Sequence, residues 1–188
     1  FTGGVVATAP SSKSIGGTVA ASGTGVINFG TTGSTITADG TIGGTSTGQI
    51  TLASVTVNDG VTLTLGAGAA SPVSAGAIQG VAGETASNIT INVADNAANP
   101  MVQIASIGTD IGTVTVTQSS GVTVTGTVNA VTVTLTDTRD GQTIDFQGAV
   151  TATSLTTAAQ GYNVRFRNGG TITNAVTFSN TGSLTIDA

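Results

Sequence analysis

The segment TDTRDGQTIDF, residues 136–146, is the most charged part of the chain and contains three closely spaced carboxylates, Asp137, Asp140 and Asp145. Two carboxylates that face one glycosidic bond, about 5–9.5 Å apart, can cleave it as acid and base or as acid and nucleophile. Any two of these three side chains could supply such a pair. Because the chain has no Trp and only one Tyr to stack on sugar rings, a polysaccharide-cleaving β-helix enzyme is the last of three hypotheses for its function.

The residue types that the chain lacks exclude most other catalytic sites. It has no Cys and no His, which removes cysteine nucleophiles, thiolate metal sites and the Ser-His-Asp triad. No calcium-binding repeat, EF-hand spacing or phosphate-binding loop occurs. We therefore expect a protein that is not an enzyme and that has no catalytic residues, cofactor or metal. Asp39, Asp59 and Asp140 are expected to stabilise turns, since each lies beside or close to a glycine.

The charge balance limits the partners of the chain. Four basic residues stand against nine acidic ones, and the net charge is −5. A groove that follows nucleic-acid phosphates needs clustered Lys and Arg, so nucleic acid is not an expected partner. No apolar run approaches the roughly 20 residues of a membrane-spanning helix, so this segment is not expected to span a membrane.

Short runs that alternate between aliphatic residues and Thr recur along the chain. VTLTLG at 61–66, ITINV at 89–93 and VTVTL at 131–135 are examples, and residues such as NDG and RDG separate the runs. Neighbouring side chains of a strand point to opposite faces, so Val, Ile and Leu would line a core and Thr the outside. Aromatic residues make up only 3% of the chain, too few for the wide core of a sandwich or barrel.

The alternation and the scarcity of aromatic residues predict an all-β fold, a parallel β-helix or β-solenoid. We expect one domain over residues 1–188 with irregular coils. At about 20 residues a coil, the chain would make roughly nine coils, about 4.8 Å apart. Two stretches lack the alternation. Residues 66–87 are predicted to form a loop or a short helix near 75–81, and residues 95–101 a second loop.

Four of the five Phe residues share one frame, a β-branched residue followed two positions later by Phe. They are Phe29, Phe146, Phe166 and Phe178. If these segments are strands, every one of the four rings points into the core. Phe146 and Phe166 are separated by one expected coil length and should stack on adjacent coils, whereas the shorter step to Phe178 implies a short coil or another side of the solenoid.

The same frame predicts which charged side chains point outward. Asp145 precedes Phe146, and Arg165 and Arg167 flank Phe166. Stacking of adjacent coils would place Asp145 beside Arg165 as an exposed ion pair. Such a pair contributes only about 0–1 kcal/mol, so its main effects would be on solubility and strand register.

The segments VTFSNTGSLTIDA, VRFRNGGTITNAV, VINFGTTGSTITADGTIGG and TLASVTVNDGVTLTLGAG resemble the passenger regions of Gram-negative autotransporters. Among these, the large surface-layer antigens of rickettsia-like bacteria are the most similar in style. The resemblance covers most of the chain. It implies an exported, Cys-poor, right-handed β-helix that acts in adhesion or surface coating, and it transfers no catalytic residue.

These observations predict where the protein is located and support two functional hypotheses that rank above the enzyme hypothesis. The first is a structural or adhesive β-solenoid on a bacterial cell surface, extracellular, whose partner is the surface of a host or neighbouring cell. The second is a subunit of a self-assembling filament or surface layer. Its partners would be like subunits in a head-to-tail homopolymer, because an uncapped solenoid exposes strand edges to which another chain can add.

Overall fold

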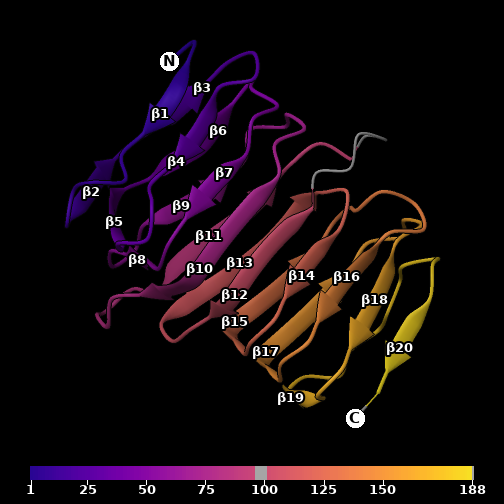
Figure 1. The fold of residues 1–188 in the computed structure, drawn as a ribbon. Helices are drawn as coiled ribbons and strands as arrows, with labels where there is room; N and C mark the ends of the chain where they lie inside the picture. Colours follow the sequence, from indigo (N-terminus) through magenta and orange to yellow (C-terminus); the bar gives the residue numbers. More distant parts are fainter. Residues whose placement is uncertain (96–100, 188) are drawn as a thin grey trace.

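The chain folds as a parallel β-solenoid of about eight turns, as the alternation predicts. A computed structural model describes residues 1–95 and 101–187, and in these ranges it contains 20 strands and no helix (Figure 1). A membrane-spanning helix is therefore not present in the described ranges. All of the strand pairs are parallel, and each coil pairs with the coil before it and the coil after it.

The strands form three faces of the solenoid. The first face contains β1 (Gly4–Val6), β4 (Val26–Asn28), β7 (Ile50–Leu52), β14 (Val122–Val124), β16 (Thr143–Phe146), β18 (Asn163–Phe166) and β20 (Leu184–Ile186). The second contains β2 (Lys13–Gly16), β5 (Ser34–Ala38), β8 (Val55–Val57) and β19 (Gly170–Ile172). The third contains β3 (Val19–Ala21), β6 (Gly40–Gly44), β9 (Thr62–Leu65), β11 (Ser87–Asn92) and β13 (Ile111–Gln118). Four longer strands turn a corner between faces: β10 (Val73–Gly80) and β12 (Val102–Ile107) join the first to the second, and β15 (Val128–Leu135) and β17 (Val150–Thr157) join the second to the third.

The register of the first face gives the length of each coil. Ile144 lies beside Val164 and Val164 beside Leu184, so each of these coils has the length that was predicted. Val73, however, lies beside Val102, so that coil is considerably longer. Coils longer than the predicted length explain why the chain makes about eight turns and not nine. At about 4.8 Å a coil, the stack is roughly 40 Å long.

Aliphatic side chains fill the interior in columns that run along the solenoid axis. On the third face, Leu63, Ile89, Val114, Val133 and Leu155 lie in register and are at most 4% exposed. Burying such a side chain stabilises the fold by about 1.5–3 kcal/mol. Because the coils repeat one cross-section, residues of similar size stack on one another, and the narrow core needs few aromatic rings.

The prediction of a loop over residues 66–87 is wrong for the part of this range that forms a strand. No helix forms near residues 75–81. Val73–Gly80 is strand β10, which pairs with β7 and β8 on one side and with β12 on the other. The alternation is hidden because the strand turns a corner, where one extra residue shifts the inward positions from Val73 and Ala75 to Ile78. Residues 66–72 and 81–86 lie outside the strands, as predicted.

The same spacing of inward residues recurs at other corners. Val102, Ile104 and Ile107 are buried with it, and so are Val150, Ala152 and Leu155. The spacing i, i+2, i+5 is therefore a sequence signal for a corner of this solenoid. The second predicted loop, 95–101, falls largely on residues 96–100, which lie outside the described residues.

Polar side chains at the turns connect successive coils. The carboxylates of Asp39, Asp59 and Asp140 accept hydrogen bonds from backbone N–H groups of the next coil, at Thr62 (2.7 Å), Thr85 (2.9 Å) and Gly161 (3.1 Å) respectively. The predicted role of these residues in turns is confirmed, and it extends to the joining of coils. Such bonds satisfy backbone donors that the strand ladders leave free at the corners.

The turns also bring backbone so close that only glycine fits at certain positions. Gly126 and Gly148 lie at the same corner of adjacent coils, and a Cβ built on Gly148 would lie 2.3 Å from the carbonyl carbon of Gly126. No real side chain tolerates this approach. The glycine-rich composition therefore follows in part from the stacking of corners.

The four predicted Phe residues point into the interior. Phe29, Phe146 and Phe166 are buried, and Phe178 is partly buried against the same core. The rings of Phe146 and Phe166 stack with centroids 5.3 Å apart, and Phe166 meets Phe178 edge-on at 6.1 Å. Phe178 comes from another wall of the solenoid, which explains the short step in sequence.

The stacked rings lead to a stability prediction. Phe146→Ala should lower the free energy of unfolding by about 3–5 kcal/mol, because it removes a buried ring and leaves a cavity. Phe1→Ala is the matched control, since this fifth Phe is 74% exposed and its loss should have little effect. Urea denaturation of both variants checks the prediction, and equal stability of the two would contradict the assignment of the rings to the core.

Candidate functional site

The third face carries two ladders of outward hydroxyl and amide side chains, which we call the threonine face. One ladder crosses six coils and consists of Thr41, Thr64, Thr90, Thr115, Thr134 and Thr156. The other crosses five coils and consists of Thr62, Asn88, Thr113, Thr132 and Ser154. The strands that carry them, from β6 to β17, are joined in register by parallel pairing (Figure 1).

The threonine face has free hydrogen-bonding capacity. Within the described residues, none of the six hydroxyl groups of the longer ladder has a hydrogen-bond partner in the protein, and neither ladder contains a charged side chain. Most of the ladder residues are half-buried by their neighbours on adjacent coils. The hydroxyl groups of the longer ladder are therefore open to solvent or to a ligand, whereas in the shorter ladder Asn88 accepts the N–H of Thr113 and Ser154 accepts from Asn174.

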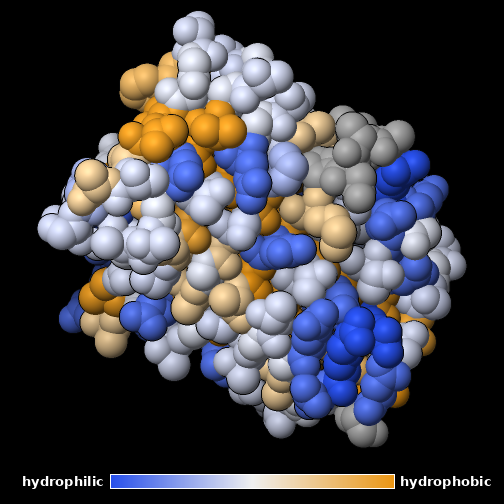
Figure 2. Space-filling view, viewed as in Figure 1, coloured by the Kyte–Doolittle hydropathy of each residue, from blue (hydrophilic) through white to orange (hydrophobic). Residues whose placement is uncertain are grey.

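The first face carries a different surface near its C-terminal end, where charged residues gather. Figure 2 shows strongly hydrophilic side chains in the region of β16, β18 and β20. Asp145 lies beside Arg165 in the strand register, as predicted. The predicted ion pair between them is nevertheless wrong, because Asp145 bonds Arg167 (2.8 Å) and Arg165 bonds Asp187 (2.6 Å).

The reach of the arginine side chain explains this diagonal pairing. Residues directly opposite on adjacent strands are about 4.8 Å apart, which is shorter than an extended arginine. Nε and Nη2 of Arg167 both donate to the Asp145 carboxylate, at distances of 2.8–3.0 Å. Asp145 is also less exposed than predicted, at 8%, because Arg167 and Gln147 cover it.

The ion pair decides the ionisation of this carboxyl group. The hydrogen bonds from Arg167 hold the pKa of Asp145 below its ordinary value, although burial acts in the opposite direction. Asp145, Arg165 and Arg167 line a shallow hollow of about 210 Å³ together with Thr143 and Gln142. Both guanidinium groups already have carboxylate partners. A ligand in the hollow would therefore meet polar side chains and paired charges.

The carboxylates considered for polysaccharide cleavage are held in three different ways. Asp145 is ion-paired to Arg167, and Asp140 accepts the N–H of Gly161. Burial, followed by the neighbouring charge of Asp95, raises the pKa of Asp137. A raised pKa suits a general acid, but the other two side chains each have a structural partner. In the described ranges these residues do not form a group that could hold a metal ion.

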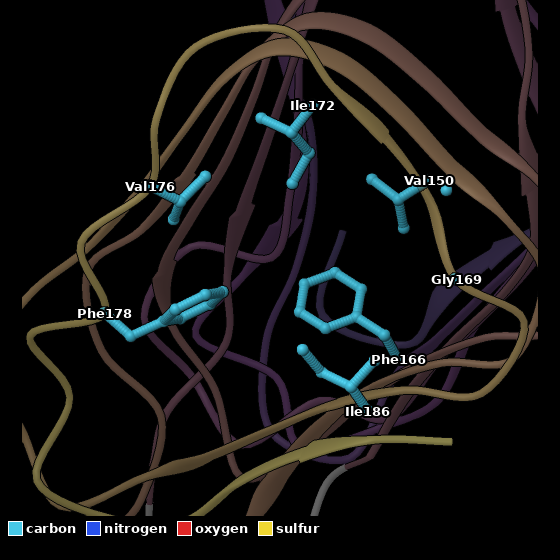
Figure 3. A pocket seen from close by; sticks show the side chains of 8 residues that line it. Val150, Phe166, Gly169, Ile172, Val176, Phe178 and Ile186 are labelled. Carbon is cyan, nitrogen blue, oxygen red and sulfur yellow. The ribbon is translucent and has the colours of Figure 1, made fainter. Parts of the chain in front are cut away.

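An apolar pocket of about 200 Å³ lies at the C-terminal end of the described stack. Figure 3 shows Val150, Phe166, Ile172, Val176 and Phe178 around this space, with their side chains directed into it. It is the interior of the solenoid seen at the last described coil. Ile186 borders the pocket and is 60% exposed.

The local sequence pattern indicates the components of these surfaces better than their arrangement. The alternation predicted outward Thr side chains, but the alignment of six of them in one ladder depends on coils of unequal length. On this face the step from Leu63 to Ile89 is longer than the step from Val114 to Val133.

Two residues that the structure brings into contacts were not singled out in the sequence, Asp187 and Tyr162. Asp187 is the ion-pair partner of Arg165. The Tyr162 side chain is buried, and its hydroxyl group donates to the carbonyl of Leu135 (2.7 Å). Thr185 lies in register with Arg165, and Asp187 follows it two positions later, just as Arg167 follows the register partner of Asp145; this repeated offset is the sequence signal that could have found it.

The pairing of Asp145 with Arg167 leads to a prediction about acid stability. Because folding lowers the pKa of Asp145, its contribution is complete above the unfolded pKa of about 3.9 and is lost as the pH falls through the lower folded value. Asp145→Asn should lower the Tm at neutral pH by about 2 °C and remove this part of the acid dependence.

Asp187→Asn is the matched control. Both partners of the Arg165–Asp187 pair are more than a third exposed, so this variant should change the Tm less. Thermal denaturation monitored by circular dichroism from strongly acidic to neutral pH compares the two variants. Equal losses of stability would show that the Asp145–Arg167 pair is no stronger than an ordinary surface pair.

No family model matches the chain, and neither a curated protein nor a solved structure is significantly similar to it. The threonine face, the charged surface and the apolar end of the stack are therefore the features that can indicate a function.

Proposed function

We propose that the chain is a structural or adhesive β-solenoid of an exported bacterial protein and acts at the cell surface. The observation that carries this proposal is the threonine face, with a ladder of threonines in register on six coils. Binding to another surface would be distributed over many weak, identical contacts. The combined affinity of such contacts is high, because all of them form on one rigid body.

Two further features support this role. The stack is roughly 40 Å long and each coil is bonded to its neighbours, so it can act as a rigid spacer. The short Val/Thr strands and the low charge are those that resemble autotransporter passengers, which are exported surface proteins. In this proposal the partner is the surface of a host or neighbouring cell, and the chain itself has no catalytic role.

The adhesive role can be tested with charges placed on the threonine face. Beads coated with the wild-type chain should adhere to a monolayer of host or bacterial cells, and the double variant Thr90→Lys/Thr134→Lys should reduce adhesion several-fold, because distributed contacts are lost together. The control is Thr51→Lys/Thr123→Lys, which adds the same charge to outward positions of the first face. Equal adhesion of the two variants would argue against the threonine face, and no adhesion of the wild type above uncoated beads would argue against an adhesive role.

A second candidate function is self-assembly into a filament or layer, and the parallel pairing of coils with one shared cross-section favours it. Phe166, Phe178 and Ile172 line the pocket at one end, while Val5 and Ala7 on the first coil are only partly buried against the core at the other. Every coil repeats one cross-section with parallel strands, so the first coil of a second copy could continue the stack. Head-to-tail contacts of this kind do not close and produce fibres.

Electron microscopy of the purified chain tests this second candidate. At high concentration the wild type should form fibres about as wide as one solenoid, because one copy would extend the sheets of the next. Ile186→Asp should abolish them by placing a charge at the joint, whereas Val131→Asp should not, since Val131 is 53% exposed on the side of the stack. Dispersed particles of the wild type at all concentrations would exclude self-assembly.

The polysaccharide-cleaving alternative has less support than either of these. Two of its three candidate carboxylates, Asp145 and Asp140, already have structural partners. Burial raises the pKa of Asp137 as a general acid requires, but a hydrolase also needs a free second carboxylate opposite it.

A further inference from the structure

The threonine face presents its hydroxyl groups at two fixed repeats. Within each ladder, neighbouring residues belong to strands about 4.8 Å apart, and the two ladders are separated by two residues of extended chain, about 6.6 Å. The pairs Thr113 and Thr115, and Thr132 and Thr134, occupy equivalent places on successive coils. Where both ladders carry a hydroxyl group, these groups form a nearly rectangular mesh, which Asn88 interrupts on one coil. The oxygen atoms on a prism plane of hexagonal ice form a mesh of similar dimensions.

The chemistry of the face also suits contact with ordered water. Each Thr presents one hydroxyl and one methyl group, and its branched Cβ restricts χ1, so the mesh needs little ordering when it binds. The hydroxyl groups of the longer ladder have no partner among the described residues. Charged side chains, which hold hydration shells of their own, are absent from both ladders. In the corresponding column of the first face, by contrast, stand Asp145 and Arg165.

From this match we propose that the threonine face binds the surface of ice. The ladder hydroxyls occupy oxygen positions of the lattice and the methyl groups fit between them, over six coils. A single hydroxyl contact of this kind is weak, but all of the contacts must break together for the protein to leave the crystal. The inference rests on the proposed adhesive role, and it names ice in place of a cell as the surface to which the threonine face adheres.

Partition into growing ice tests this proposal directly. A solution of the purified chain is frozen slowly from a cold probe, and the protein is measured in the ice and in the remaining liquid. The wild type should be enriched in the ice relative to an unrelated protein of similar size. Thr115→Tyr lies at the centre of the longer ladder and should reduce the enrichment in ice at least about tenfold. Its bulky ring holds the face away from the lattice, so many contacts are lost together.

Two further variants keep the test decisive. Thr134→Tyr repeats the change on the next coil, in case Thr115→Tyr does not fold. Thr56→Tyr places the same ring on an outward, half-buried position of the second face and should partition like the wild type. Circular dichroism confirms that each variant used is folded. Exclusion of the wild type from ice, or an equal loss in Thr56→Tyr and Thr115→Tyr, would overturn the proposal.

The outcome can be separated from that of the adhesive role itself. The same variants are tested for adhesion to cell monolayers. Loss of adhesion in Thr115→Tyr without any partition of the wild type into ice would retain the adhesive role and overturn ice as its target. Partition into ice without adhesion to cells would support the ice-binding face and count against a cellular partner.

Discussion

Hydrogen bonding between successive coils is the interaction on which the rest of this structure depends. A short parallel strand cannot satisfy its backbone groups alone, so each coil needs one neighbour above it and one below it. This requirement holds the coils about 4.8 Å apart and forces them to share one cross-section. The columns of aliphatic side chains, the glycine contacts such as Gly126 with Gly148, and the aspartates that reach the next coil all follow from it.

The same constraint gives the surface its order. Because each outward position lies directly above its equivalent on the coil before, a residue type that recurs once a coil becomes a ladder. Threonine recurs in this way on the third face from Thr41 to Thr156, and the surface becomes a mesh of hydroxyl groups. Where the outward residues are long and charged, as at Arg165 and Arg167, the side chains reach past their direct neighbours and pair diagonally. Function in such a protein is therefore more readily spread over a face than concentrated in a pocket.

Departures from regularity lie at corners, at turns and near the ends of strands, where the ladder of hydrogen bonds is easiest to interrupt. In the long coil between Val73 and Val102, β10 keeps its register with β12, β11 shifts register against β13 near its two ends, and residues 81–86 lie outside the strands. Strand β10 bends round a corner at the small residues Ala75, Gly76 and Ala77, which allow the backbone to turn against the neighbouring coils. Variation in coil length is thus tolerated without disturbing the core or the threonine face.

The sequence alone determined the parallel β-solenoid, the inward direction of Phe29, Phe146, Phe166 and Phe178, and the outward direction of Thr, because these depend on alternation within single strands. It also determined the stacking of Phe146 on Phe166, whose separation equals one coil. Only the tertiary structure decided the strand at Val73–Gly80, the pairing of Asp145 with Arg167 and the alignment of the threonine ladders. These depend on the register between coils of unequal length and on the reach of side chains across it, and neither is visible in the local pattern of one strand.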